Sequence, residues 1–151
     1  MKNNRKYYLA YGSNLDNGQM LRRCPDACYG GPTEIDNHVM VFRSNYRGNG
    51  VANIEPFLGA KVPGCVWEIS ERDEQSLDIY EGWPRLYRKE MMFVEVDGKP
   101  VEAMVYVMNE GFELTEPSDY YLDIIQQGYI DCALPLHKLD EAVHLTRLLI
   151  G

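Results

Sequence analysis

The strongest constraint on the fold is a tight-turn signal at Asp97-Gly98, which lies between two segments of β-strand character. Asp-Gly between alternating apolar residues favours a two-residue turn whose twist matches that of an antiparallel hairpin. Residues 87–96 and 101–108 are therefore predicted to be paired strands. Small apolar residues alternate with larger or polar ones along the second segment, so the two faces of that strand differ chemically.

The rest of the chain shows strand signals mainly before helix signals. Further strands are predicted at residues 7–11, 38–43, 51–54 and 62–69, and helices at 15–23, 71–81, 118–128 and 135–149. The helix at 71–81 has the clearest limits, because Ser70 and Asp73 suit a capping box and Gly82 suits the position after a helix. This order favours an α+β fold with a curved or barrel-like sheet and helices packed around it. Without repeats or linkers, residues 1–151 are predicted to form a single domain.

The composition limits the class of partner. The net charge is −8, with only 15 Lys and Arg residues, so the chain lacks the cationic surplus that nucleic acids or anionic membranes attract. We therefore expect a small-molecule partner, with neither nucleic acid nor membrane, and the composition predicts no oligomeric state. The N-terminal residues lack the long apolar core of a signal peptide, which makes the cytoplasm the expected location.

The cysteines give no sign of a metal or redox site. The chain has four cysteines, Cys24, Cys28, Cys65 and Cys132, and none of them forms a CxxC pair. We expect free thiols and no bound metal.

A strand-like run ends abruptly at Gly12-Ser13-Asn14, in the segment YYLAYGSNL. A strand that turns through such residues into a helix leaves backbone N–H groups unpaired and pointing the same way, which suits an anion or an oxyanion. The alternative is an ordinary turn in which Ser13 or Asn14 caps the next helix. The spacing alone does not decide between these two interpretations.

A carboxylate, Glu81, lies in the last turn of the helix predicted at 71–81. The negative end of the helix dipole disfavours an ionised carboxylate there, which would raise the pKa of Glu81 toward the range that suits a general base. The alternative is a solvated glutamate at a helix end, which costs only tenths of a kcal/mol when salt screens it.

Taken together, these stretches resemble the γ-glutamylcyclotransferases of the AIG2-like superfamily. Residues 11–15 (YGSNL) resemble the signature loop of that family, residues 50–54 (GVANI) its following strand, and Glu81-Gly82 with Tyr87 its catalytic segment. The resemblance continues through Tyr106 and residues 117–121 (PSDYY), so it spans nearly the whole chain in the family's order. It implies a small mixed barrel with flanking helices, in agreement with the α+β prediction.

The resemblance also implies a reaction, the release of 5-oxoproline from γ-glutamyl amines or peptides. The substrate's own α-amino group attacks its γ-carbonyl, so the reaction needs no serine nucleophile, metal or cofactor. By resemblance, Glu81 is the general acid/base, and the loop formed by Tyr11, Gly12, Ser13, Asn14 and Leu15 holds the glutamyl carboxylate or the developing oxyanion. Tyr87, Tyr106 and Tyr121 would line the pocket and donate hydrogen bonds, with Tyr120 as the alternative to Tyr121.

Two other functions remain compatible with these residues. One is a γ-glutamylamine cyclotransferase that acts on isopeptide-like adducts or on adducts of a biosynthetic amine, since the two enzymes differ only in the pocket for the leaving amine. The other is a non-catalytic binding module that keeps the glutamyl site, although a binding protein needs no base at Glu81. Ser13 has no G-x-S-x-G surroundings, and His38, His137 and His144 have no spacing typical of a catalytic triad.

Overall fold

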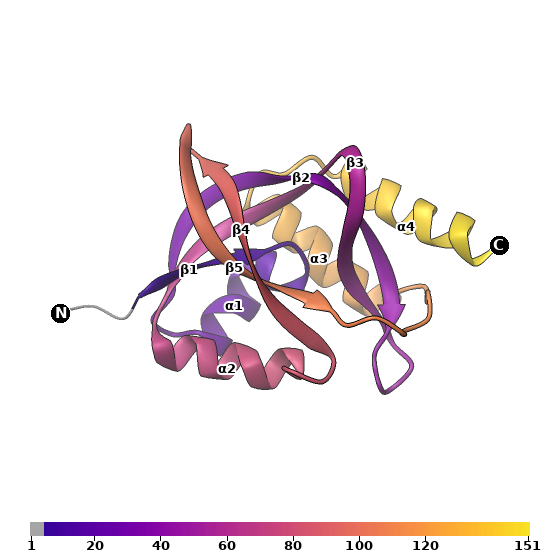
Figure 1. The fold of residues 1–151 in the computed structure, drawn as a ribbon, viewed down its shortest axis with the longest axis horizontal. Coiled ribbons are helices and arrows are strands. Elements are labelled where there is room, and N and C mark those ends of the chain that lie inside the picture. Colours follow the sequence, from indigo (N-terminus) through magenta and orange to yellow (C-terminus); the bar gives the residue numbers. More distant parts are fainter. Residues whose placement is uncertain (1–4) are drawn as a thin grey trace.

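The structure, a computed structural model that describes residues 5–151, is a curved mixed sheet with helices packed around it (Figure 1). The elements are β1 (Lys6–Ala10), the 3-10 turn η1 (Ser13–Leu15), α1 (Asn17–Arg23), β2 (Cys28–Ser44), β3 (Gly50–Ile69), α2 (Glu71–Glu81), β4 (Tyr87–Val96), β5 (Lys99–Met108), α3 (Asp119–Asp131) and α4 (His137–Ile150). The α+β fold expected from the order of the elements is confirmed. The first four residues, which the predictions of a single domain and of no signal peptide include, lie outside the described range.

The sheet has five strands in the order β2-β3-β1-β5-β4. All neighbours are antiparallel except β1 and β5, which run parallel where Tyr8 pairs with Met104. The sheet curls so far that its two outer strands approach each other, and the hydroxyl of Thr33 in β2 donates to the carbonyl oxygen of Glu95 in β4 at 2.7 Å. This contact gives the sheet its barrel-like form.

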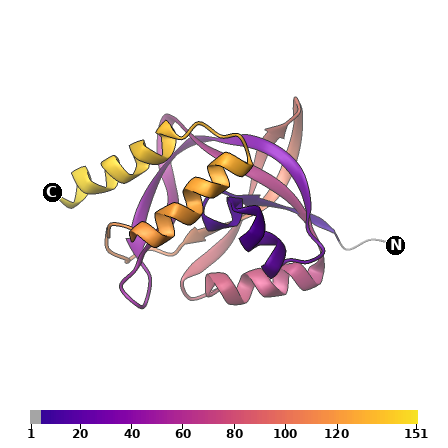
Figure 2. The same ribbon diagram turned by 180° about the vertical axis from the view of Figure 1, so that it is seen from behind.

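Strand β1 lies in the middle of the sheet, and its last three residues are buried. Helices α1 and α3 cover the face of the sheet that is turned away in Figure 1, as the reverse view in Figure 2 shows, while α2 runs along one border of the sheet. Helix α4 extends from the body toward the C-terminus in both views. The turn that follows β1 is therefore enclosed between the sheet, α1, α2 and α3.

The largest difference from the sequence prediction is the length of β2 and β3. We expected three separate strands at 38–43, 51–54 and 62–69, but residues 28–44 and 50–69 form two long paired strands. The register of the pair shifts next to Gly31 and next to Asn37, two residues that have positive φ. Such bulges use residues that otherwise indicate turns, so the sequence pattern breaks where the strand continues.

Pro63-Gly64, a pair of residues that commonly indicates a turn, lies well inside β3. A Cβ atom at position 64 would lie 2.7 Å from the carbonyl oxygen of Ala10 in β1. Glycine is therefore needed for close packing of β3 against β1, and it does not end the strand.

The helix at 71–81 and the hairpin at Asp97-Gly98 are confirmed. The capping box of Ser70 and Asp73 is present, and Gly82 ends the helix in the left-handed conformation with φ 69°. Helix α3, by contrast, runs through Gly128 to Asp131, so our assignment of Gly128 as its end is wrong. A Cβ atom there would lie 2.4 Å from the Cβ of Leu15, so Gly128 lets α3 pack directly on η1.

The four cysteines are free thiols, as predicted, and three of them are buried. Cys24 and Cys28 do not share a helical turn, because Cys24 caps α1 and Cys28 begins β2. Among the helices of residues 5–151, none has both the length and the apolar character needed to cross a bilayer.

Candidate active site

A cleft with a volume of about 150 Å³ opens where the end of β1, the η1 turn, β3, the end of α2 and the hairpin β4–β5 meet. It brings together residues that are far apart in the sequence. Eight of the nine residues selected from the sequence line it, namely Tyr11, Gly12, Ser13, Asn14, Glu81, Tyr87, Tyr106 and Tyr121. The ninth, Leu15, is fully buried and packs against Gly128, so its side chain belongs to the core and not to the cleft wall.

The segment after β1 folds into one short 3-10 turn. The N–H of Leu15 donates to the carbonyl oxygen of Gly12, and the N–H of Asp16 donates to that of Ser13, both at 3.1 Å. The N–H groups of Ser13 and Asn14 open the turn and have no acceptor within it. Asp16 caps the following helix α1 by accepting from Gln19 N–H, so neither Ser13 nor Asn14 serves as the cap.

Gly12 allows this turn to sit close to its neighbours. A Cβ atom at that position would lie 3.3 Å from the Cβ of Ala52 and 3.5 Å from the hydroxyl oxygen of Tyr121. Any side chain there would enter the cleft or press on its wall. The glycine therefore keeps open the space beside the start of η1.

Glu81 is the last residue of α2, and its carboxyl group faces the cleft. Burial raises its pKa to about 7, and the positive charge of Arg23 opposes that rise. We expected the helix dipole to perturb this group, whereas burial is the main cause in the structure. Within residues 5–151, no group donates a hydrogen bond to this carboxylate. A carboxylate with a pKa near 7 can both accept and return a proton at neutral pH.

The three selected tyrosines are held by hydrogen bonds of different kinds. The hydroxyl of Tyr87 donates to the carbonyl oxygen of Ala52 at 2.7 Å, and that of Tyr106 donates to Asp78 Oδ1 at 2.6 Å. Tyr121 instead accepts from the N–H of Ala52 at 3.1 Å. We expected all three hydroxyls to donate to a ligand; in the structure, protein acceptors take the protons of Tyr87 and Tyr106.

The two neighbouring tyrosines, Tyr120 and Tyr121, differ in their exposure. Tyr120 is 75% exposed on the outer side of α3, whereas Tyr121 lines the cleft. Burial strongly raises the pKa of Tyr121, so its hydroxyl keeps its proton at neutral pH.

Sequence reasoning missed several residues in or behind the cleft wall, and Arg23, which lies behind Asn14 and Tyr80, is the most prominent. Its guanidinium lies 3.4 Å from the centroid of the Tyr80 ring and donates to Asn14 Oδ1 at 2.5 Å. A second donor of the group reaches Gln19 Oε1 at 2.7 Å. The i,i+4 spacing of Gln19 and Arg23 on a helix was a visible signal for that last contact, but the contact with Tyr80 depends on the packing of α1 against α2.

Tyr8, Asn45, Tyr80 and Asp78 were also missed. Tyr8, Asn45 and Tyr80 line the cleft, and Asp78 lies behind Tyr106. The hydroxyls of Tyr80 and Ser13 share a hydrogen bond of 2.9 Å, and Asn14 Nδ2 donates to the hydroxyl of Tyr8 at 2.9 Å. Asp78 precedes Glu81 by three residues in α2, a spacing that places both side chains on one face and could have drawn attention to it.

The chain is similar to a described family and to proteins of known activity. Residues 8–129 match the family described as gamma-glutamyl cyclotransferase, AIG2-like. The human gamma-glutamylcyclotransferase is 30% identical over 143 residues, which cover 85% of this chain and 72% of the relative, and the bovine enzyme is 29% identical over the same length and shares.

The fold has close counterparts among solved structures. A gamma-glutamyl cyclotransferase structure superposes with a TM-score of 0.82 at 27% identity, covering 91% of this chain and 86% of that one. YkqA from Bacillus subtilis superposes with a TM-score of 0.81 at 20% identity, covering 94% of this chain and 55% of that one, which shows a shared fold.

Proposed function

The chain belongs to the AIG2-like gamma-glutamyl cyclotransferase family, and we propose that it cyclises a γ-glutamyl amine or γ-glutamyl peptide to 5-oxoproline, with Glu81 as the general acid/base. Its relatives support an enzyme of this kind in general. The observation that carries the residue assignment is the position of Glu81: an enclosed carboxylate with a pKa of about 7, in the same cleft as the η1 turn.

The proposed reaction forms one bond and breaks another within the substrate. The α-amino nitrogen attacks the γ-carbonyl carbon, and the bond from that carbon to the leaving amine breaks. Holding the substrate in the folded shape that brings these atoms together can lower the activation free energy by up to roughly 7–11 kcal/mol. The protein thus supplies mainly orientation, proton transfer and stabilisation of charge.

Glu81 has two roles in the proposed reaction. It first removes a proton from the substrate ammonium, because only the neutral amine has a lone pair for attack. It then returns that proton to the leaving nitrogen, which departs as a neutral amine. The attacking nitrogen loses its second proton as the lactam forms, and the freed amine takes up that proton, directly or through Glu81. Proton transfer by a positioned side chain typically contributes about 10²–10⁴-fold in rate.

The backbone N–H groups at the start of η1 can donate hydrogen bonds to a negatively charged group of the substrate. The backbone at Ser13 and Asn14 can hold the glutamyl carboxylate or the oxygen that becomes negative as the tetrahedral intermediate forms. Losing one such donor typically costs about 10²–10³-fold in rate. Arg23, above Tyr80, adds positive charge on the same side of the cleft.

The test is to incubate the protein with free and α-N-acetylated γ-glutamyl compounds and to separate the products by chromatography. The free compounds should yield 5-oxoproline, and the acetylated ones should yield no product because their nitrogen cannot attack. A hydrolase would instead release glutamate from the free compounds and could release N-acetylglutamate from the acetylated ones. Glutamate as the product would contradict the proposal.

The same assay addresses the leaving group. A panel of γ-glutamyl amino acids, γ-glutamyl-lysine isopeptides and γ-glutamyl adducts of simple amines separates a cyclotransferase for peptides from one for γ-glutamylamines. The compound with the highest kcat/KM identifies the class of leaving amine.

A further inference from the structure

The hydroxyl groups in the cleft differ in whether their protons are free, and Tyr106 shows this most clearly. A tyrosine hydroxyl has one proton to donate and two lone pairs that accept. The proton of Tyr106 goes to Asp78 Oδ1 at 2.6 Å. Lys89 lies 2.9 Å from the same carboxylate, which is therefore a charged, ion-paired group with no proton to give. The oxygen of Tyr106 can only accept hydrogen bonds from a ligand.

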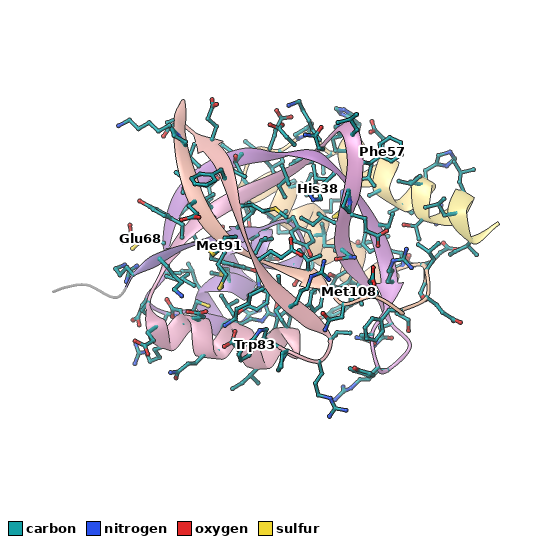
Figure 3. The ribbon with its side chains drawn as sticks, viewed as in Figure 1. His38, Phe57, Glu68, Trp83, Met91 and Met108 are labelled. Carbon is teal, nitrogen blue, oxygen red and sulfur yellow. The ribbon has the colours of Figure 1, made fainter. Side chains whose placement is uncertain are left out.

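Asp78 is itself firmly held. Its partner Lys89 also contacts Glu74 at 2.8 Å, and the Lys89 ammonium lies 4.0 Å from the ring centroid of Trp83, the residue labelled just beyond α2 in Figure 3. A lysine with three such partners has little freedom to leave the carboxylate. The orientation of Asp78, and through it that of the Tyr106 proton, is therefore fixed before any ligand binds.

Two more tyrosines of the cleft donate their hydroxyl protons to the protein itself. The hydroxyls of Tyr87 and Tyr11 donate at 2.7 Å to the backbone carbonyl oxygens of Ala52 and Tyr106. A backbone carbonyl can only accept, so the direction of both bonds is certain. The protons of Tyr11, Tyr87 and Tyr106 are thus all taken by protein acceptors.

Two other tyrosines have the opposite arrangement. Tyr121 accepts from the backbone N–H of Ala52, a group that can only donate, so its own proton is free. Tyr8 accepts from Asn14 Nδ2. The amide of Asn14 is oriented by Arg23, which donates to its oxygen and leaves its nitrogen to face Tyr8. Tyr8 and Tyr121 therefore keep protons that can be donated to a ligand.

We propose that Asp78 is a positioning residue that makes Tyr106 a hydrogen-bond acceptor, and that Tyr106 thereby selects substrates with a free α-ammonium group. This inference rests on the proposed function and specifies how the cleft recognises the nucleophile. An ammonium group has three N–H donors and no lone pair, so it fits a site made of acceptors. Glu81 and the acceptor-only tyrosines form such a site.

The hydroxyls with free protons complete the recognition. Tyr8 and Tyr121 suit the oxygen atoms of the substrate, which accept and cannot donate. A γ-glutamyl group has an ammonium and oxygen atoms close together, and the cleft also brings one tyrosine of each kind together, since the rings of Tyr8 and Tyr106 are 6.0 Å apart between centroids. The division of the hydroxyls therefore matches the division of charge in the substrate.

The test compares the binding of L-glutamate with that of glutarate by isothermal titration calorimetry. These probes differ only in the α-ammonium, and neither contains the amide bond that the reaction breaks. The wild type should prefer L-glutamate. Tyr106→Phe should reduce this preference about tenfold to a hundredfold, the value of a hydrogen bond to a charged group. Tyr121→Phe, the matched control, should weaken the binding of both probes and leave the preference unchanged.

The role of Asp78 requires a double-mutant cycle. Asp78→Leu should reduce the preference for L-glutamate as much as Tyr106→Phe does, and the double variant should lose little more, because Asp78 acts through Tyr106. Glu74→Gln is the control, since it removes the other carboxylate partner of Lys89 and leaves the bond between Asp78 and Tyr106 intact.

Three results would overturn the inference. These are a wild type that does not bind L-glutamate more tightly than glutarate, an unchanged preference in Tyr106→Phe, and full additivity of Asp78→Leu with Tyr106→Phe, which would indicate a purely electrostatic or structural role of Asp78. Because binding is measured without turnover, these results are separate from the release of 5-oxoproline, whose absence would contradict the proposed function instead.

Discussion

Helix α2 carries two carboxylates three residues apart, and the structure surrounds them in opposite ways. Asp78 accepts the proton of Tyr106 and is paired with Lys89 at 2.9 Å. Glu81, one turn later on the same face, receives no hydrogen bond from residues 5–151, and burial raises its pKa to about 7. Asp78 is thus fully partnered, whereas Glu81, partly buried in the cleft, accepts no hydrogen bond within residues 5–151.

The comparison shows how one short helix can supply two chemical functions. A partnered carboxylate keeps its charge and orients its neighbours, whereas an enclosed carboxylate without partners exchanges its proton near neutral pH. The residue types are nearly the same, so the surroundings decide the function. The surroundings come from β4 and β5 for Asp78, and mainly from the closure of the cleft for Glu81.

The strongest test of the comparison is Glu81→Gln. An amide keeps the shape of the side chain but cannot take a proton, so kcat should fall by about 10²-fold or more while the protein stays folded. Turnover is measured as 5-oxoproline release, and folding by circular dichroism. A folded Gln variant with turnover close to that of the wild type would show that Glu81 is not the general acid/base.

Replacing each carboxylate by its amide should change stability in opposite directions. The folded-state pKa of Glu81 lies above its unfolded value, so the folded protein is stabilised below the unfolded pKa of about 4.5 and loses that stabilisation as pH rises to about 7. Glu81→Gln should therefore raise the free energy of unfolding at pH 8 by on the order of 3 kcal/mol and change it little at pH 4.

Asp78→Asn should instead lower the free energy of unfolding at pH 8 by about 1–3 kcal/mol, because it removes the charged partner of Lys89. Urea denaturation of both variants at pH 4 and pH 8 checks the pair. The same sign for both variants at pH 8 would show that the two environments do not differ as described.

A smaller effect is expected at Ser13, whose side chain shares a hydrogen bond with Tyr80. If the substrate amine is the nucleophile and Glu81 moves the proton, Ser13→Ala loses one hydrogen bond of roughly 0.5–1.5 kcal/mol, or about threefold to tenfold in rate. Mass spectrometry of the wild type during turnover should find no covalent glutamyl adduct. A trapped adduct on Ser13 would mean that the serine, and not the substrate amine, attacks.

The smallest effect concerns the cation near Glu81. Arg23 lowers the pKa of Glu81, so Arg23→Gln should raise that pKa and move the acidic limb of the kcat/KM profile to higher pH. The loss of activity should be larger at pH 6 than at pH 8. Arg22→Gln, which changes an exposed neighbour, is the matched control. If the acidic limb of the kcat/KM profile lies at the same pH in all three proteins, Arg23 does not influence the pKa of Glu81.

Local signals were enough to locate some elements and some site residues in the sequence. The limits of α2 followed from Ser70, Asp73 and Gly82, because a capping box and a left-handed glycine act within a few residues. The β4–β5 hairpin followed from its Asp-Gly turn in the same way. Glu81 followed from its position in that helix and from the family-like segment around it.

Contacts between distant elements were not predictable in this way. The lengths of β2 and β3 depend on bulges at Gly31 and Asn37, whose residue types indicate turns when only the sequence is read. The contact of Arg23 with Tyr80 joins α1 to α2, and that of Tyr106 with Asp78 joins β5 to α2. Such pairs are set by how the helices pack on the sheet, so their roles emerge only in three dimensions.

Ala52 has a role that a conventional alanine scan would pass over. Its backbone N–H donates to Tyr121 and its carbonyl oxygen accepts from Tyr87, so one residue of β3 leaves the hydroxyl proton of Tyr121 available and binds that of Tyr87. Replacing the side chain alters neither backbone group. Both hydrogen bonds are made by the main chain, so only a change to the main chain would separate them. An ester in place of the Ala52 amide would remove the hydrogen bond to Tyr121 and keep the one from Tyr87.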